Sequence, residues 1–166
     1  MLTILLTMLM WQMPAGTSHD DHHTQMAKDK LMKTRGAAAM GFDQDATVHH
    51  FRLALDGGTI EVAVRGSDDD ANRSAIRAHL QEVARQFAEG DFSKPVMTHA
   101  EHPPGADRMK ALRAEIDYAY EETPAGGLVR IRSGNAQAVE AVHEFLRYQI
   151  REHRTGDLLQ PPDGRL

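Results

Sequence analysis

The sequence predicts an α+β fold in which two β-hairpins form one antiparallel four-stranded sheet and helices pack on one face, in the order ββα(α)ββα. Two glycine-rich turns, at 56–58 and 123–127, lie between short strand-like runs and predict the hairpins. Apolar residues at helical spacing in two further stretches, one ending near residue 88 and one over 135–153, predict the main helices. Such an order favours one sheet with one covered face.

The first hairpin is predicted from alternation of apolar and polar residues. In the strand 47–55, Phe51 and Leu53 share a face with His49, because successive side chains of a strand point to opposite sides. The strand 59–65 (TIEVAVR) alternates in the same way. Each strand therefore has one face suited to a core.

The remaining elements follow in chain order. Acidic residues at 67–70 favour the start of the first long helix. Residues 91–105 contain three prolines and are expected to form a long loop, and a short helix is expected over about 104–114. The strands 115–122 and 128–133 then form the second hairpin, before the last helix.

Composition limits the classes of function. The chain has 166 residues, which suits one modest domain with an extension. It contains no cysteine, which excludes disulfides, thiolate metal sites and thiol catalysis. Its net charge of −5, with acidic and basic residues interspersed, argues against nucleic acid as a partner, since nucleic-acid binding needs a basic face.

The N-terminus resembles a signal peptide, predicted over residues 1–18. Residues 2–11 (LTILLTMLMW) are apolar but too short to span a bilayer, and small residues follow at 15–18, although no basic residue precedes the apolar run. A buried N-terminal strand or helix is the alternative. We therefore expect a periplasmic or secreted protein without an integral membrane span in the mature chain.

Three further regions are predicted beyond the signal peptide. Residues 19–41 are expected to be a flexible His-rich tether with a short helix, and residues 42–157 a compact α+β domain. Residues 158–166 are expected to be a disordered tail.

Several segments of the chain resemble a family of small exported bacterial proteins without an assigned activity. The matching segments are MGFDQDATVHHFRL (40–53), DGG (56–58), FAEGDF (87–92), PPG (103–105), YEETPAGG (120–127) and HEFLRYQIREHRTGD (143–157). Family members are sometimes named aspartate carbamoyltransferase. This chain has neither the Ser-Thr-Arg-Thr phosphate loop of that enzyme nor the cysteines of its zinc-binding regulatory chain. The resemblance thus implies export and a compact α+β domain, but no activity.

Histidine and methionine are the side chains that most suggest chemistry, with ten and nine copies. Imidazole and thioether together suit copper better than other common metals, and a set rich in methionine suits Cu(I). The strongest candidate metal ligands are Met40, His49, His99 and Met109. The secondary candidates are His50, Met97 and His102.

Each candidate also has a structural interpretation. His49 and His50 lie on opposite faces of their strand, so they cannot chelate one ion side by side. The alternative for His49 is a buried neutral histidine bonded to a carbonyl, and the alternative for Met97 and Met109 is that they fill the core. Among the other histidines, His143, His79 and His153 are expected on helices, the first packed against the core and the other two on the surface. His19, His22 and His23 are expected in the tether.

Three hypotheses of function remain open. The first is an exported, non-catalytic metal-binding accessory protein, with copper as the metal. The second is a periplasmic module that binds another exported protein and no metal, which predicts an exposed apolar patch and no clustering of His and Met side chains. The third is a small enzyme of unknown reaction, which requires a pocket with a histidine or carboxylate of perturbed pKa; no catalytic residue is identifiable in the sequence.

Overall fold

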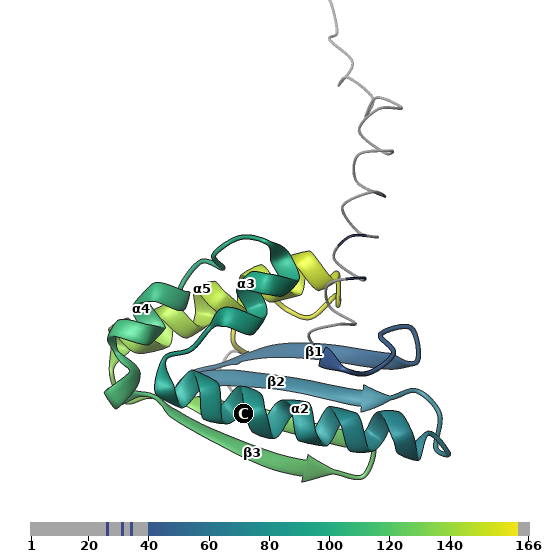
Figure 1. The fold of residues 1–166 in the computed structure, drawn as a ribbon. Coiled ribbons are helices and arrows are strands. Elements are labelled where there is room, and N and C mark those ends of the chain that lie inside the picture. The colour runs from purple at the N-terminus through teal and green to yellow at the C-terminus, as the bar shows by residue number, and fades with distance from the viewer. Residues whose placement is uncertain (1–25, 27–30, 32–33, 35–39, 163–166) are drawn as a thin grey trace, which may run out of the picture.

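The computed structural model describes residues 26, 31, 34 and 40–162. Four strands form one antiparallel sheet in the order β1-β2-β4-β3 (Figure 1). Their bounds are β1 (Thr47–Ala54), β2 (Gly57–Val64), β3 (Asp117–Thr123) and β4 (Gly126–Arg132). The predicted α+β fold, with two hairpins joined in one sheet, is confirmed.

The two hairpins join where β2 pairs with β4. One row of opposed residues crosses all four strands, because Phe51 pairs with Ile60, Ile60 with Val129, and Val129 with Tyr120. Buried and more exposed residues alternate over the second half of β1, where Phe51 and Leu53 are buried and Arg52 is exposed. The inner face of the sheet is therefore continuous from edge to edge.

The main helices cover this inner face (Figure 1). Their bounds are α2 (Asp70–Glu89), α3 (Ser93–His99), α4 (Ala106–Ala111) and α5 (Ala136–His153), with a 3₁₀ turn, η1 (Arg113–Glu115), after α4. α2 packs on β3 and β4, α5 packs on β1 and β2, and α4 packs on α5. The α2 and α5 N-caps are Asp69 and Asn135, whose side chains accept bonds from backbone N–H groups of the first turn.

The prediction that residues 91–105 form one long loop is wrong, because this segment contains α3. Asp91 Oδ1 accepts a bond from the backbone N–H of Ser93 at 2.8 Å, and the Thr98 hydroxyl donates to the Lys94 carbonyl at 3.0 Å. Pro95 lies in the first turn, where its missing N–H breaks no helical bond. α3 therefore brings His99 toward the sheet on a helix.

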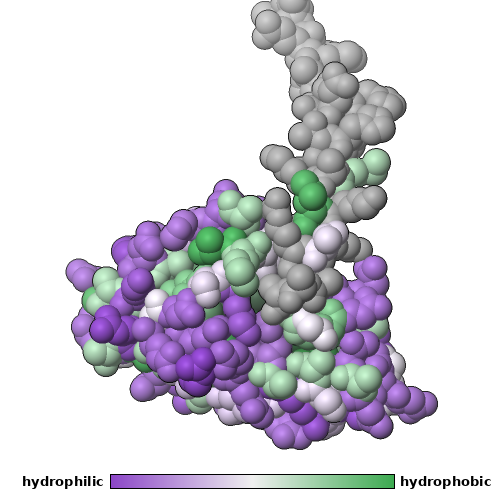
Figure 2. All heavy atoms as spheres, in the orientation of Figure 1, coloured by the Kyte–Doolittle hydropathy of each residue, from purple (hydrophilic) through white to green (hydrophobic). Residues whose placement is uncertain are grey.

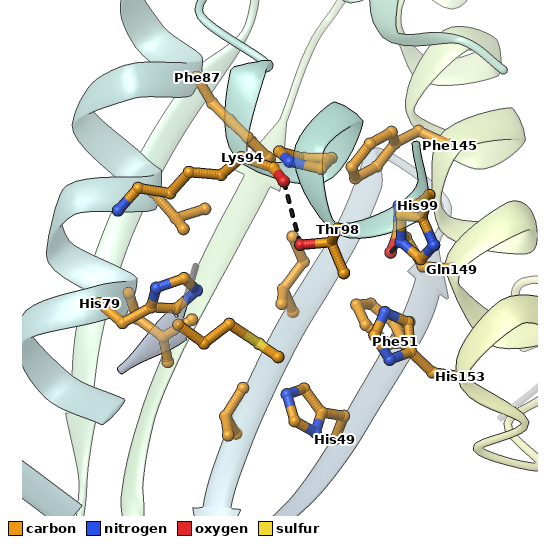
Figure 3. A pocket seen from close by; sticks show the side chains of 16 residues that line it. His49, Phe51, His79, Phe87, Lys94, Thr98, His99, Phe145, Gln149 and His153 are labelled. Carbon is orange, nitrogen blue, oxygen red and sulfur yellow. Dashed lines mark hydrogen bonds between the residues drawn. The ribbon is translucent and has the colours of Figure 1, made fainter. Parts of the chain in front are cut away.

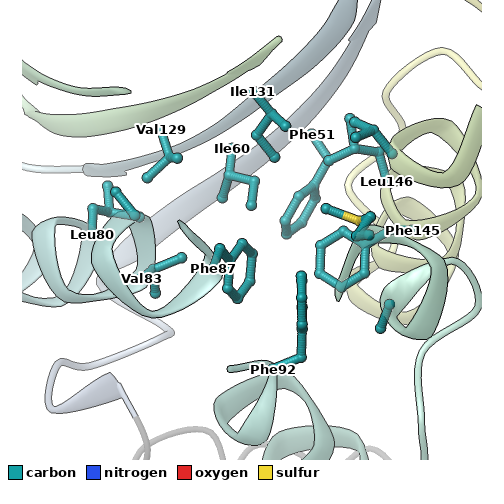
Figure 4. Close-up of a cluster of buried hydrophobic side chains, with 14 of the residues drawn as sticks. Phe51, Ile60, Leu80, Val83, Phe87, Phe92, Val129, Ile131, Phe145 and Leu146 are labelled. Carbon is teal, nitrogen blue, oxygen red and sulfur yellow. The ribbon is translucent and has the colours of Figure 1, made fainter. Parts of the chain in front are cut away.

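Aromatic rings fill the space between the sheet and the helices (Figure 4). Phe87 stacks on Phe92 with ring centroids 4.5 Å apart, and Phe145 meets Phe87 edge to face at 5.7 Å. All three side chains are buried. Offset and edge-to-face pairs are the favoured arrangements of aromatic side chains, so these rings give the core a defined packing.

The outer surface differs from this core. On the face seen in Figure 2, hydrophilic residues predominate and hydrophobic ones occur in small groups. No helix in the part of the chain that the structure describes is long and apolar enough to cross a membrane.

The predicted signal peptide and nearly all of the tether and its short helix lie outside the described residues. Residues 158–162 form no regular element, and the Leu159 carbonyl accepts a bond from Arg147 Nε at 3.0 Å.

Replacement of Gly105 by alanine is expected to destabilise the domain by at least about 2 kcal/mol. Gly105 has φ +84°, and a Cβ there would overlap the Ala141 carbonyl oxygen of α5. Urea denaturation measures the loss, with Gly134→Ala as the control because a Cβ at Gly134 meets no atom within 4 Å. Equal stabilities of the two variants would contradict this view of the α4–α5 contact.

Candidate functional site

A cavity of about 70 Å³ lies between the inner face of the sheet and helices α2, α3 and α5 (Figure 3). A cavity of this size holds several water molecules or a small bound group. The described residues of its wall are mostly apolar and include four histidines, one methionine, one lysine and no carboxylate. The polar residues and methionine of the wall are Met40, His49, His79, Lys94, Thr98, His99, Gln149 and His153.

Each of the four histidines comes from a different element. His49 lies on β1, His99 ends α3, His79 lies on α2, and His153 ends α5. All four are half-buried. The fold therefore gathers at one cavity side chains that are up to about a hundred residues apart in the sequence.

The prediction that His79 and His153 are surface residues is wrong. His79 follows the buried Ile76 by three residues and precedes the buried Val83 by four, so it shares their helix face. His153 follows the buried Ile150 by three residues in the same way. This helical spacing is the signal in the sequence that could have placed both histidines on the buried faces of their helices.

Three of the imidazole rings form a contiguous group, while His79 lies across the cavity from them (Figure 3). His153 stacks on His49 with centroids 5.5 Å apart and an interplanar angle of 17°, and it meets His99 nearly at a right angle at 5.2 Å. Phe42 stacks on His49 at 5.9 Å and meets His79 edge to face at 5.5 Å. His153 thus lies between His49 and His99 and links them.

Burial holds these imidazoles in the neutral form. Desolvation lowers the pKa of His49 to about 4, with smaller effects of His50 and Arg65. Desolvation also lowers the pKa of His79 to about 4 and that of His153 to about 3. The pKa of His99 is lowered by desolvation, which outweighs its bond to Gln149. A neutral imidazole has one nitrogen lone pair, so each ring is in the state that binds metals.

Three buried polar atoms of the cavity residues have no hydrogen-bond partner among the described residues: His49 Nε2, His99 Nδ1 and Gln149 Nε2. Buried polar atoms are nearly always hydrogen-bonded, and leaving one unpaired costs about 1–3 kcal/mol. A water molecule, a polar ligand or a metal ion in the cavity can satisfy such atoms.

Three of the four strongest candidate ligands, Met40, His49 and His99, line this cavity together. Met109 does not, because it is fully buried in the hydrophobic core on α4. His153 lies in the cavity wall instead.

The structure does not bring the secondary candidates to the cavity. His50 points to the other face of β1, and its Nδ1 lies 2.9 Å from Asp157 Oδ1. Met97 and His102 are exposed on α3 and on the following loop. His143 is buried, as predicted for a packed helix histidine, and its Nε2 lies 2.8 Å from the Ala54 carbonyl oxygen.

His49 and His153 also line a second hollow of about 240 Å³ at the end of α5, together with Arg65 and Thr155. The stacked pair thus borders both the inner cavity and this outer hollow.

Within the described part of the chain, no group of three or more His, Asp or Glu side chains is arranged to hold a metal ion. Comparison with protein-family models, with curated proteins and with solved structures finds no match for this chain. The function is therefore inferred from the cavity and from the side chains that line it.

Proposed function

We propose that this chain is an exported, non-catalytic accessory protein that binds Cu(I) in the cavity, with Met40, His49 and His99 as ligands and His153 as the adjacent imidazole. One observation carries the proposal: two half-buried neutral imidazoles line the same cavity as a thioether, and their buried nitrogens, His49 Nε2 and His99 Nδ1, have no partner among the described residues. Imidazole and thioether donors without thiolate or carboxylate suit a soft copper ion.

The charge of the cavity favours a monovalent ion. Among the described residues, no Asp or Glu lies in its wall and Lys94 contributes a positive charge, while Glu82 acts on His79, and Glu101 and Glu152 act on His99, from outside the wall. Moving an ion out of water into an apolar site is costly, and the cost rises steeply with its charge when no opposite charge compensates it. Zn(II) and Cu(II), which combine well with carboxylates, are therefore less suited to this cavity than Cu(I).

Copper binding requires the rings to rearrange, because His153 lies between His49 and His99. The stacked arrangement of His49 and His153 prevents both rings from directing lone pairs at one ion at once. His49 with His99 and Met40 is the set that the cavity wall supports.

Export remains part of the proposal on sequence grounds. The apolar run at 2–11 and the small residues at 15–18 support a periplasmic or secreted location. In such compartments a cysteine-free copper site resists the oxidation that thiolates undergo.

Cu(I) titration of the purified mature protein against a competing chelator tests the proposal. We expect binding tighter than micromolar and a loss of at least about 100-fold in the double variant His49→Ala plus His99→Ala, since both nitrogen donors are then absent. The matched control is Met97→Ala plus His102→Ala, which removes one histidine and one methionine outside the cavity and should leave the affinity unchanged. Weaker binding by the wild type, or equal affinities of both double variants, would falsify the proposal.

Binding of a small uncharged molecule is the second candidate function, because the cavity wall is mainly apolar with a few unpaired polar atoms.

An enzyme with this cavity as its active site would use the histidines of lowered pKa. Among the described residues of the cavity wall there is no Asp, Glu, Ser or Tyr to act with them, and the Thr98 hydroxyl donates to the Lys94 carbonyl oxygen. The protein-interaction module predicts no clustering of His and Met, whereas Met40 and four histidines share one cavity.

A further inference from the structure

Gln149 is one of the few buried polar residues of the domain, with 4% of its surface exposed. It lies on α5 in the wall of the cavity, and its Oε1 is 3.1 Å from His99 Nε2. A buried amide in an apolar wall is costly unless it is hydrogen-bonded. The residue that it contacts is one of the proposed copper ligands.

The chemistry of this contact determines where the proton of His99 lies. The amide oxygen of Gln149 can only accept a hydrogen bond, so His99 Nε2 must carry the hydrogen and donate it. A neutral imidazole has one N–H, which leaves the lone pair on Nδ1. That Nδ1 atom is buried and has no partner among the described residues.

We propose that Gln149 is a positioning residue that holds His99 in the Nε2–H tautomer and so keeps the Nδ1 lone pair free for the ion. The use of that lone pair rests on the proposed function, whereas the tautomer itself does not. Histidines that bind metals usually donate their other N–H to a carbonyl or carboxylate oxygen, which orients the ring and raises the basicity of the free nitrogen.

Two neighbours on α5 fix the orientation of the same ring. The ring of His99 meets Tyr148 edge to face at 5.1 Å and His153 at 5.2 Å. The Tyr148 hydroxyl donates to Glu101 at 2.6 Å, which holds the chain just after His99 against α5. Gln149 therefore acts on a ring whose plane is already restrained, and its contribution is the choice of the protonated nitrogen.

The side-chain length and polarity of Gln149 are both required. Leucine at this position has no acceptor, so it leaves the two tautomers of His99 free to interchange. Glutamate supplies an acceptor of the same reach and restores the Nε2–H bond. Gln137, exposed on the same helix, offers a matched position for the leucine substitution.

Nitrogen-15 NMR of the histidine rings in the metal-free protein at neutral pH tests the inference. We expect His99 to carry its proton on Nε2 in the wild type, to lose this preference in Gln149→Leu, and to keep it in Gln149→Glu and Gln137→Leu. Cu(I) affinity should fall about 10–100-fold in Gln149→Leu and recover in Gln149→Glu.

The outcomes separate the two proposals. A wild-type His99 protonated on Nδ1, or the same tautomer in wild type and Gln149→Leu, overturns the inference about Gln149. The expected tautomers in a protein that does not bind Cu(I) support the role of Gln149 and contradict the proposed function.

Discussion

The free energy of unfolding is expected to fall by several kcal/mol as the pH decreases from about 6.5 to about 4, because buried histidines resist protonation in the folded state. Burial lowers the pKa of His49 and His79 to about 4, and that of His153 to about 3, from an ordinary value of 6.5. Each unit of difference corresponds to about 1.4 kcal/mol. The summed effect of three such histidines is therefore comparable with the total free energy of unfolding of a domain, about 5–15 kcal/mol.

The sign of this effect follows from proton binding. Between pH 6.5 and pH 4 the three imidazoles are charged in the unfolded chain and neutral in the folded one. The unfolded chain then binds more protons, so the free energy of unfolding rises with pH in this range. The full stability is present above about pH 6.5. It is lost as the pH falls toward 4.

Urea denaturation of the metal-free protein at several pH values measures this slope. The variant His153→Phe removes one of the three groups and keeps a flat apolar ring beside His49 and Phe51. Because the pKa of His99 is lowered as well, its slope between pH 5 and pH 6 should be smaller by about one quarter to one third. A wild-type stability that is constant from pH 6.5 to pH 4.5 would show that the rings are accessible to protons in the folded state.

Much of the fold could be predicted because local signals determine it. Glycines at the hairpin turns, acids before α2 and apolar periodicity in α5 each act within a few residues along the chain. The strands begin earlier than predicted, at Gly57 and Gly126. Each of these strands begins with a glycine at a position where a Cβ would overlap a carbonyl oxygen of the neighbouring strand. The close approach of the two backbones therefore requires glycine there.

The candidate site could be predicted only in part, because it depends on packing between distant segments. Alternation along β1 placed His49 on the inner face, and the sequence raised His99 and Met40 as its partners. Nothing local to residue 153 indicates that the end of α5 reaches β1. That contact is a property of the assembled layers, in which α5 packs on β1 and β2.

Met109 shows the opposite error. Its proximity in sequence to His99 and His102 suggested a shared site, but sequence proximity does not determine which way a helix faces. α4 packs on α5, and Met109 lies on the buried side of α4, where it is fully enclosed. Methionine fills irregular gaps in cores, which accounts for its place there.

Replacement of Phe145 by alanine should destabilise the domain by about 3–5 kcal/mol, because it removes a fully buried ring and leaves a cavity. Phe145 is 1% exposed and meets Phe87 at 5.7 Å and Phe92 at 6.0 Å. It also lines the histidine cavity, so the new space would be continuous with the existing one. The midpoint of thermal unfolding should fall by about 10 °C or more.

Phe145→Leu is the matched control, since leucine keeps a branched apolar side chain and most of the volume. Thermal unfolding followed by circular dichroism should give the order wild type, Phe145→Leu, Phe145→Ala from most to least stable. Equal losses in the two variants would indicate that the aromatic contacts to Phe87 and Phe92, and not the filled volume, carry the stabilisation.

The comparison matters for the site, because Phe145 lies four residues before Gln149 on α5 and packs on the same side of that helix. A wall that relaxes into the enlarged cavity would move Gln149 away from His99, so Phe145→Ala should weaken Cu(I) binding more than Phe145→Leu does.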